Sequence, residues 1–549
     1  MFKLIYKLLS FLPACALAFM PMACVEDYNL AQQEKNAQKM EPAVGFSGAS
    51  NAPETRTSGK YGTIEGEKLG ITFYWTPNDY NHMYINKGTE AAPQWEKSTA
   101  IHFIDKDADT HAATATFHFK GKYENKQYTM LYVGGDQSMS TKSKLYVNFP
   151  NEQKQASPED GELANSGDCG VAKTSCVHYF KEGKGWGYHG DRHTFTLEHK
   201  AAYVTLLPYN PHGNIINANF VSAVISAKES IYGKFPFTEK GVDVSKRPLN
   251  QTEVSLDLTQ NGKKEGQPIA SNKEDAWQNA GIVVLPPGKY TNFQVTFRFK
   301  DHFTKKTFTH EQTYSVLKLD AGTNQPVFGK LNVEDFTPSF IKYTMWGAEK
   351  YYYTSDNPAP HNWNTKATGI PAPEDGRWPK DEDDQRWYSE NEEADAGVPT
   401  IKAFTPNEAS YILTKDCYWN PKTLWAFDGH VYQGILWVAV INKGAHKAFD
   451  GKDWTSVATT KNKESIKEEK GQPQKCPTVG YYPIPLLGRY INGELKEVGK
   501  AGYYWINGAD PDDSDNKAYY IKVDKTGISI NNDGDKKWGC IPFTGDIRP

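Results

Sequence analysis

Apolar and polar residues alternate along several short stretches of the chain. From Ala113 to Lys120 the odd positions are apolar and the even positions are polar, and Phe293 to Lys300 repeats the pattern. A period of two predicts strands with one buried face. Turn residues such as Pro286-Pro287-Gly288 separate these stretches. Short strands divided by turns predict β-sandwich domains.

The stretch from Phe195 to Leu206 changes phase once. Alternate residues up to His199 share one face, and alternate residues from Ala202 onward share the other. A slip of one residue predicts a β-bulge near Lys200. His199 is then expected to face inward as a hydrogen-bonded core histidine rather than as a catalytic one.

Composition divides the chain into regions. The length of 549 residues corresponds to about three or four domains. We predict a sandwich over 57–207, a second over 208–335 and a separate module over 340–549, where ten of the 14 Trp lie. Burial in a core is the expected state of most of these Trp. Asn420 followed by Pro421 predicts a short helix from Pro421 to Phe427.

The N-terminus has the pattern of an export signal. Lys3 and Lys7 precede an uncharged stretch that ends at Cys24. A basic start, an apolar segment and a small residue at the cut predict a secretory signal peptide over 1–23. Cys24 is the predicted lipidation site of an outer-membrane lipoprotein precursor, and the alternative is a plain secretory signal with Cys24 as an ordinary thiol. No later stretch is apolar enough to span a membrane.

Residues 24–56 are predicted to be a polar tether in which Val44 and Phe46 suit one short strand. Arg56 is the first Arg of the chain, and the next is Arg192. A protease that cuts only after Arg therefore has one site in this leader, between Arg56 and Thr57. Chance in a Lys-rich protein is the alternative explanation.

Five cysteines remain after Cys24, an odd number that leaves at least one thiol free or paired between chains. Cys169 and Cys176 lie close together in the Gly-rich stretch 151–192, which is predicted to be a long loop. A local disulfide between them is one interpretation, and two separate thiols are the other. The roles of Cys417, Cys476 and Cys540 stay open.

The sequence contains few motifs for binding or catalysis. The net charge of −4 argues against a nucleic-acid partner. No nucleophile elbow, zinc motif or phosphate-binding loop is present, so we expect no catalytic activity, no metal centre and no cofactor. A calcium or ligand site is a minority interpretation of one acidic cluster near an aromatic residue: Asp510, Asp512, Asp513, Asp515 and Trp505.

One motif resembles the fimbrillin family of Gram-negative anaerobes. It reads Phe195-x-Leu197-x-His199-x-x-Ala202-x-Val204 and follows a lipoprotein signal and a short tether. The resemblance implies two tandem transthyretin-like β-sandwiches and export as a lipoprotein. It also implies removal of the N-terminal segment by an Arg-specific protease and donor-strand exchange with other fimbrial subunits.

The C-terminal part resembles a C-type-lectin-like α+β module. The similar segments are Leu486–Tyr490, Gly502–Trp505, Ala518–Tyr520, Ile528 and Trp538–Cys540. The layout is most similar to a tip subunit of the major fimbrium, which implies adhesion to a host or bacterial surface ligand. The short tail after Cys540 offers no spare strand to donate, which also favours a tip position.

The predicted protein is therefore mainly β, exported, and part of a cell-surface fimbrium. Three alternatives remain. A glycan-binding lipoprotein held in the membrane or a fimbrial anchor would keep Cys24 and its lipid. An enzyme with a lectin-like module would need a clustered catalytic site, and the sequence offers none.

Overall fold

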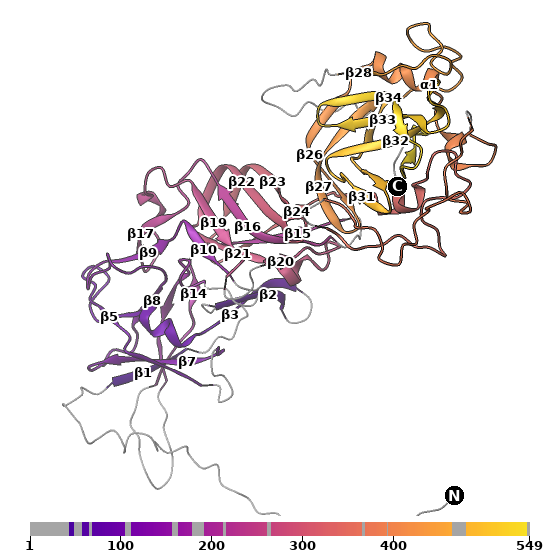
Figure 1. The fold of residues 1–549 in the computed structure, drawn as a ribbon. Helices are drawn as coiled ribbons and strands as arrows, with labels where there is room; N and C mark the ends of the chain where they lie inside the picture. The colour runs from indigo at the N-terminus through magenta and orange to yellow at the C-terminus, as the bar shows by residue number, and fades with distance from the viewer. Residues whose placement is uncertain are drawn as a thin grey trace, which may run out of the picture.

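The computed structural model is an elongated assembly of β-sheets (Figure 1). It describes residues 43–48, 58–64, 68–104, 111–155, 163–177, 192–211, 216–260, 265–364, 368–391, 394–463 and 479–545. The mainly β character predicted from the alternating pattern is confirmed. Among these residues the only α-helix is α1 (Pro406–Ser410), beside the short 3-10 helices η2 (Pro77–His82), η3 (Val244–Lys246), η4 (Ala276–Asn279), η5 (Thr337–Lys342), η6 (Pro399–Lys402) and η7 (Tyr411–Thr414).

Two five-stranded sheets form the first sandwich. One has the order β12 (Ser175–Val177), β13 (Arg192–Phe195), β1 (Ala43–Gly48), β7 (Ala115–Lys120) and β6 (Ala100–Phe103). The other has the order β14 (Glu198–His199), β11 (Cys169–Lys173), β8 (Thr129–Val133), β4 (Met83–Asn86) and β5 (Trp95–Lys97). The predicted loop over 151–192 thus contains β11 and β12, as well as β10 (Glu152–Lys154).

The sheet that contains β8 is covered on both faces. Met130 and Tyr132 pack into the core shared with the β1 sheet, whereas Leu131 and Val133 pack into a second core. Successive side chains of a strand point to opposite faces, so a strand that is apolar at every position must be buried on both sides. The hairpin of β2 (Ser58–Ile64) and β3 (Lys68–Tyr74) joins the second core through Tyr61 and Phe73.

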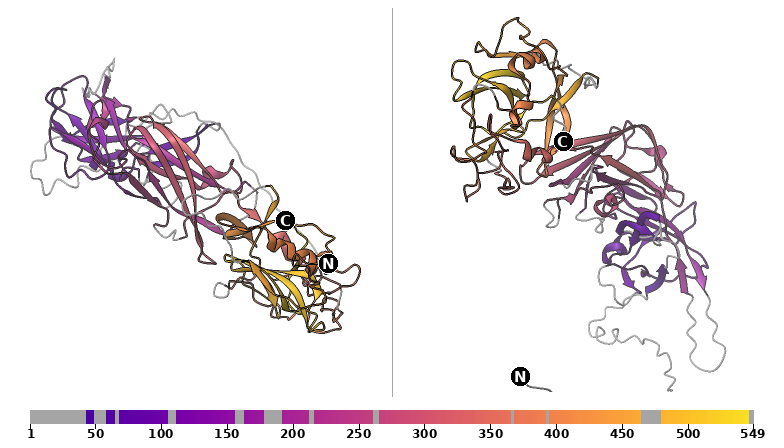
Figure 2. Two further views of the ribbon diagram at one scale, coloured as in Figure 1. Left: turned by 90° about the horizontal axis from the view of Figure 1, so that it is seen from above. Right: turned by 90° about the vertical axis from the view of Figure 1, so that its right-hand side faces the viewer.

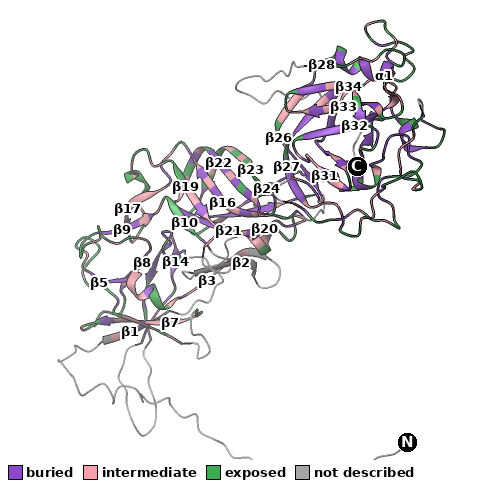
Figure 3. Ribbon diagram, viewed as in Figure 1, coloured by how far each residue is buried: buried purple, intermediate pink, exposed green. Residues whose placement is uncertain are grey.

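A second sandwich adjoins the first. Its larger sheet has the order β10, β19 (Glu253–Asp257), β16 (Ala218–Ser226), β22 (Gly288–Asp301) and β23 (Thr307–Leu319), with β20 (Gln267–Pro268) also on β16. Its smaller sheet has the order β21 (Gly281–Leu285), β15 (Ala202–Tyr209) and β24 (Asn324–Lys330). A further sheet joins β18 (Gly241–Val242), β17 (Gly233–Thr238) and β9 (Leu145–Phe149). Burial alternates along β22, as its sequence predicts (Figure 3).

The two sandwiches share strands across the predicted boundary. The boundary after residue 207 falls inside β15, which pairs with β21 and β24. Earlier strands also cross over, since β9 pairs with β17 and β10 pairs with β19. The chain before residue 335 is therefore a continuous stack of sheets rather than two separate sandwiches.

The phase change near Lys200 has a different cause from the predicted bulge. Phe195 ends β13, His199 ends β14 and Ala202 begins β15, and these strands belong to three different sheets. Each move to another sheet resets which face is buried. The inward position of His199 is confirmed, because its Nδ1 lies 2.8 Å from Oδ1 of the buried Asp168.

The last region has two larger sheets. One has the order β25 (Glu334–Asp335), β26 (Tyr418–Phe427), β27 (His430–Ala439) and β29 (Tyr481–Ile484). The other has the order β28 (Lys461–Lys463), β34 (Gly527–Asp535), β33 (Lys517–Asp524), β32 (Ala501–Ala509) and β35 (Ile541–Pro542). A hairpin of β30 (Arg489–Ile491) and β31 (Glu494–Lys496) forms a separate two-stranded sheet beside it. Among the described residues of the predicted α+β module, α-helix is limited to the five residues of α1.

The predicted helix at Pro421–Phe427 is wrong. Asn420 does accept hydrogen bonds from the backbone N–H of Lys422 (2.9 Å) and Thr423 (3.2 Å), as a helix N-cap would. Here these bonds close a turn inside β26, where the pairing register with β27 shifts between Asn420 and Leu424. Asn stabilises such turns as readily as helix starts, so the local signal does not distinguish them.

A buried His–Asp hydrogen bond and shared apolar packing join the last region to the second sandwich. His430 Nδ1 lies 2.7 Å from Asp301 Oδ2, and both side chains are buried. Burial opposes the charged form of Asp301, but hydrogen bonds from His430 and from two turn amides hold its pKa below the usual value. Leu424 and Val431 also belong to the core of the second sandwich. The last region therefore packs against one end of the stack (Figure 2).

Two buried glutamines complete the backbone pairing inside the second sandwich. Gln153 accepts a hydrogen bond from Val284 N (2.9 Å) and donates one to Val284 O (2.7 Å). Gln155 accepts from Ile282 N (2.8 Å) and donates to Ala280 O (3.3 Å). The two side chains act as a substitute strand edge for β21 and connect the two sheets.

Replacing Gln153 by Met should destabilise the protein. The change keeps the side-chain length but leaves the N–H and C=O of Val284 without a partner, which costs about 2–5 kcal/mol of unfolding free energy. Urea unfolding followed by Trp fluorescence measures this. The control is E152Q, at an exposed position of the same strand, which should change stability by less than about 0.5 kcal/mol. Equal stability of Q153M and E152Q would contradict the assignment.

Candidate assembly site

Strand β1 lies inside a sheet although it precedes every other described strand. Its six residues pair antiparallel with β7, from Ala43 opposite Lys120 to Gly48 opposite Ala115. Its last three residues also pair in parallel with β13, with Phe46 opposite His193. A strand with neighbours on both sides supplies hydrogen-bond partners to both. Without β1, the edges of β7 and β13 would lose these partners.

The side chain of Phe46 fills an aromatic box and is fully buried. Its ring centroid lies 5.5 Å from that of Phe119, 5.2 Å from Tyr123 and 6.0 Å from Tyr128, all edge-on. It stacks on the ring of His193 at 4.8 Å. These separations suit favourable aromatic pairs, so Phe46 is the main apolar anchor of β1.

The residues on either side of Phe46 meet close neighbours. A Cβ atom at Gly45 would lie 2.9 Å from Thr116 Cγ2 and 3.4 Å from His118 Cε1. Ser47 Oγ lies 3.0 Å from Thr116 Oγ1. The slot between β7 and β13 therefore takes a residue without a side chain, then an aromatic residue, then a hydroxyl.

A histidine pair borders this slot. His118 of β7 lies opposite Gly45, and its Nε2 is 2.9 Å from His102 Nδ1 of β6. Burial, with a smaller contribution from His102, lowers the pKa of His118. Protonation of His118 is therefore disfavoured while the sheet is folded.

Replacing Phe46 by Ala should remove most of the anchoring energy of β1. Deletion of a fully buried Phe side chain costs about 3–5 kcal/mol through lost burial and the cavity left behind. We expect a loss of this size in urea unfolding of the full chain. S47A, a smaller change in the same strand, is the matched control and should cost about 1 kcal/mol. A loss in F46A no larger than that in S47A would mean that β1 is not anchored by its aromatic residue.

Acid should weaken the β1 sheet through His118. The pKa of His118 is lowered in the folded chain and near 6.5 in the unfolded chain, so the unfolded chain binds the proton more tightly. The stabilising contribution is present above pH about 6.5 and is lost as the pH falls below it. Thermal unfolding at pH 7.5 and at pH 5 should show a smaller pH-dependent loss in H118Q than in the wild type. His82 and His310 also have lowered pKa values, but they are common to both proteins. Identical pH slopes would exclude a role for His118.

Three of the predicted site residues lie outside the described residues. These are the lipidation site Cys24 and the processing pair Arg56 and Thr57. In sequence, Arg56 falls between the end of β1 at Gly48 and the start of β2 at Ser58. The strand predicted around Val44 and Phe46 is confirmed as β1.

The structure contains no disulfide between Cys169 and Cys176, which the sequence left as one of two possibilities. Cys169 lies on β11 and is buried in the core that the two sandwiches share. Cys176 lies on β12, at the end of the opposite sheet. Closeness in sequence does not bring the two sulfurs together, because the chain changes sheets between them.

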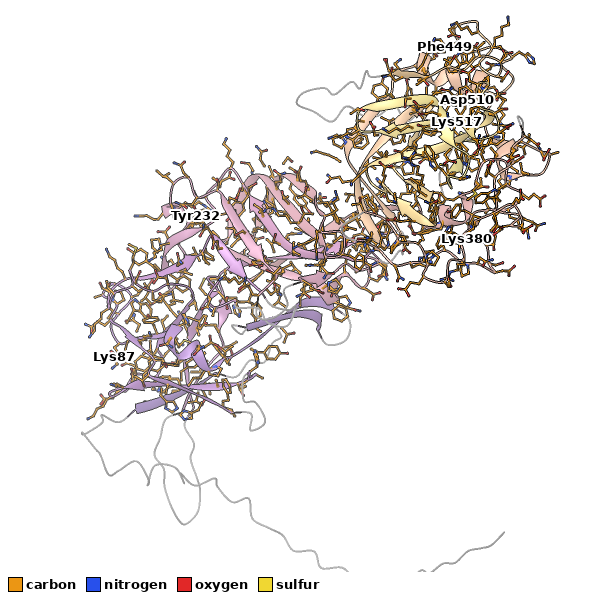
Figure 4. All side chains as sticks on the ribbon, in the orientation of Figure 1. Lys87, Tyr232, Lys380, Phe449, Asp510 and Lys517 are labelled. Atoms are coloured by element: carbon orange, nitrogen blue, oxygen red, sulfur yellow. The ribbon has the colours of Figure 1, made fainter. Side chains whose placement is uncertain are left out.

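The predicted acidic site does not form a ligand cluster. Among the described residues no group of three His, Cys, Asp or Glu side chains is arranged to hold a metal. Asp510 accepts hydrogen bonds from Asp512 N and Asn532 Nδ2, and Asp513 pairs with Lys517 Nζ at 3.1 Å. Asp510 and Lys517 lie close together in the last region (Figure 4).

Asp515 and Trp505, two further residues of that candidate site, belong to no ligand cluster. Asp515 is exposed. Trp505 is fully buried and donates its indole N–H to Thr344 O at 3.0 Å. The remaining Trp of the last region are likewise buried or half-buried. The acidic run is thus a turn stabilised by its own carboxylates.

A cavity of about 610 Å³ lies between the second sandwich and the last region. Its lining includes His302 and Phe303 from one side and His361, Trp363, Asp428 and His430 from the other. Asp428 accepts hydrogen bonds from Trp363 Nε1 (2.9 Å) and lies 2.6 Å from His361 Nδ1. Sequence reasoning missed this cavity, since its residues come from separate segments with no shared motif.

Comparison with known proteins does not establish a family for the chain. No family model and no curated protein matches the chain. A solved structure of a candidate cell adhesion protein from Bacteroides ovatus aligns with 53% of this chain and 94% of its own, at 11% identity and a TM-score of 0.30. A fimbrial protein from Bacteroides ovatus aligns with 89% of this chain and 98% of its own, at 11% identity and a TM-score of 0.22. Similarities this low assign neither a fold nor a function to the chain. No helix among the described residues is long and apolar enough to cross a membrane.

Proposed function

We propose that the protein is a non-enzymatic, adhesive accessory subunit at the tip of a bacterial fimbria. In this proposal it is exported as an outer-membrane lipoprotein through Cys24. Cleavage between Arg56 and Thr57 then frees β1, and a donor strand from another fimbrial subunit takes its place. The observation that carries the proposal is the position of β1, a central strand contributed by the segment that precedes Arg56.

The physical case rests on what the loss of β1 leaves behind. The edges of β7 and β13 would lose their hydrogen-bond partners, and the ring-lined box around Phe46 would open to water. An exposed apolar edge attracts any extended chain. A strand from another subunit satisfies the same backbone groups, while its alternate side chains refill the core.

The arrangement of the molecule supports a tip position. The β1 sheet lies at one end of the elongated chain, and the last region lies at the other end (Figures 1 and 2). A subunit held through the β1 slot therefore presents residues 340–549 away from its neighbour. We assign to this region the binding of a host or bacterial surface ligand.

The decisive experiment is to determine the N-terminal residue of the protein recovered from assembled fimbriae and from membranes. We expect Thr57 in fimbriae, and we expect R56K to remain uncut, to keep its lipid and to be absent from fimbriae. K39R/R56K is the matched variant, because it moves the single leader Arg ahead of β1 instead of after it. It should be cut without losing β1 and should still fail to assemble. Fimbriae that contain a lipidated Cys24 start would overturn the tip proposal and favour an anchor or a membrane-held glycan-binding lipoprotein.

A further inference from the structure

We infer that the β1 slot accepts only donor strands with a three-residue pattern: a glycine, an aromatic residue, and a serine or threonine. This inference rests on the proposed function and specifies the partner that it requires. The donor would run antiparallel to β7 and parallel to β13, as β1 does.

The aromatic position follows from the box around Phe46. Four rings surround it at centroid distances between 4.8 and 6.0 Å. An aliphatic side chain would leave part of this space empty, and unfilled space in a core is destabilising. A polar side chain would be buried there beside apolar faces without a partner.

The glycine position follows from the methyl group of Thr116. That Cγ2 atom would be only 2.9 Å from any Cβ at position 45. Thr116 is β-branched and anchored by its hydroxyl contact with Ser47, so it has little freedom to move aside. Gly45 carries no left-handed backbone requirement, so the demand for glycine comes from space alone.

Together these positions fix the register of the donor. A shift of one residue would turn the aromatic side chain away from the core. A shift of two would place it on the same face but outside the box, and would place another residue against Thr116. Proline is also excluded at central positions, because an interior strand needs its N–H groups.

The test uses the full chain after cleavage with an Arg-specific protease, with native mass spectrometry to confirm that the chain starts at Thr57 and no longer carries β1. The probe is a fluorescein-labelled synthetic peptide of residues 41–50, and binding is followed by fluorescence anisotropy. We expect F46A in the peptide to weaken binding at least about 100-fold. G45A should weaken it about tenfold.

Two controls separate pattern from composition. A peptide with Gly45 and Phe46 exchanged keeps its composition and should not bind measurably. S50T, beyond the end of β1, should bind like the wild-type sequence. In the protein, T116S removes the methyl group but keeps the hydroxyl. It should restore binding of the G45A peptide to within about threefold of the wild type and leave the F46A peptide weak.

The outcomes separate this inference from the proposed function. No cleavage after Arg56, or no peptide uptake after cleavage, would count against the proposed function. Uptake of all peptides with similar affinity would overturn the pattern alone. Thermal unfolding of the intact, uncut chain gives an independent readout: G45A should lower the Tm, and G45A/T116S should recover most of the loss. Absence of that recovery would also overturn the inference.

Discussion

The need of every buried strand edge for a hydrogen-bond partner governs this structure. Buried N–H and C=O groups without partners are costly, so each strand in the stack must be paired on both sides or end at the surface. The chain meets this need in three ways. An N-terminal strand enters between β7 and β13, two glutamine side chains substitute for a strand beside β21, and β25 pairs with β26 where the last region begins. The first of these relies on the segment that the proposed cut after Arg56 would separate from the rest of the chain.

The continuous stacking of sheets explains why the loss of β1 need not unfold the whole protein. The sheet that contains β8 is supported by a second core on its far face, with residues from both sandwiches. The sheet that contains β15 is likewise buried on both faces, through Val204 on one side and Tyr203 on the other. The slot is therefore bordered by a layer that other cores hold in place. A binding site for an external strand needs this kind of fixed support.

Local patterns predicted the strands well and their partners poorly. The alternation at Ala113–Lys120 and Phe293–Lys300 became β7 and β22, because period-two burial is a property of the strand itself. The central place of β1 was not predictable in this way, since its pairing with β7 joins positions far apart in sequence. The helix predicted after Asn420 is wrong for a related reason. The Asn420 side chain stabilises the same local turn in a helix start and in a strand bulge, and only the pairing of β26 with β27 decides between them. No local sequence pattern indicated the cavity between the second sandwich and the last region.

In the proposed function, the connection between β1 and β2 would let the same slot hold β1 in the precursor and a donor strand in the assembled subunit. While the connection is intact, β1 competes for the slot as part of the same chain, at an effective concentration that no separate strand matches. A cut after Arg56 removes that advantage, and β1 then stays only through its own contacts. In the proposed exchange, the contacts of Phe46 and the ladder with β7 would oppose its departure, and a donor would have to replace them along the edge. A donor of the same pattern restores every lost contact, and a donor without it leaves the box partly empty. In the proposed exchange, the steric demand at Thr116 and the ring-lined box would govern both the retention of β1 and the choice of the strand that replaces it.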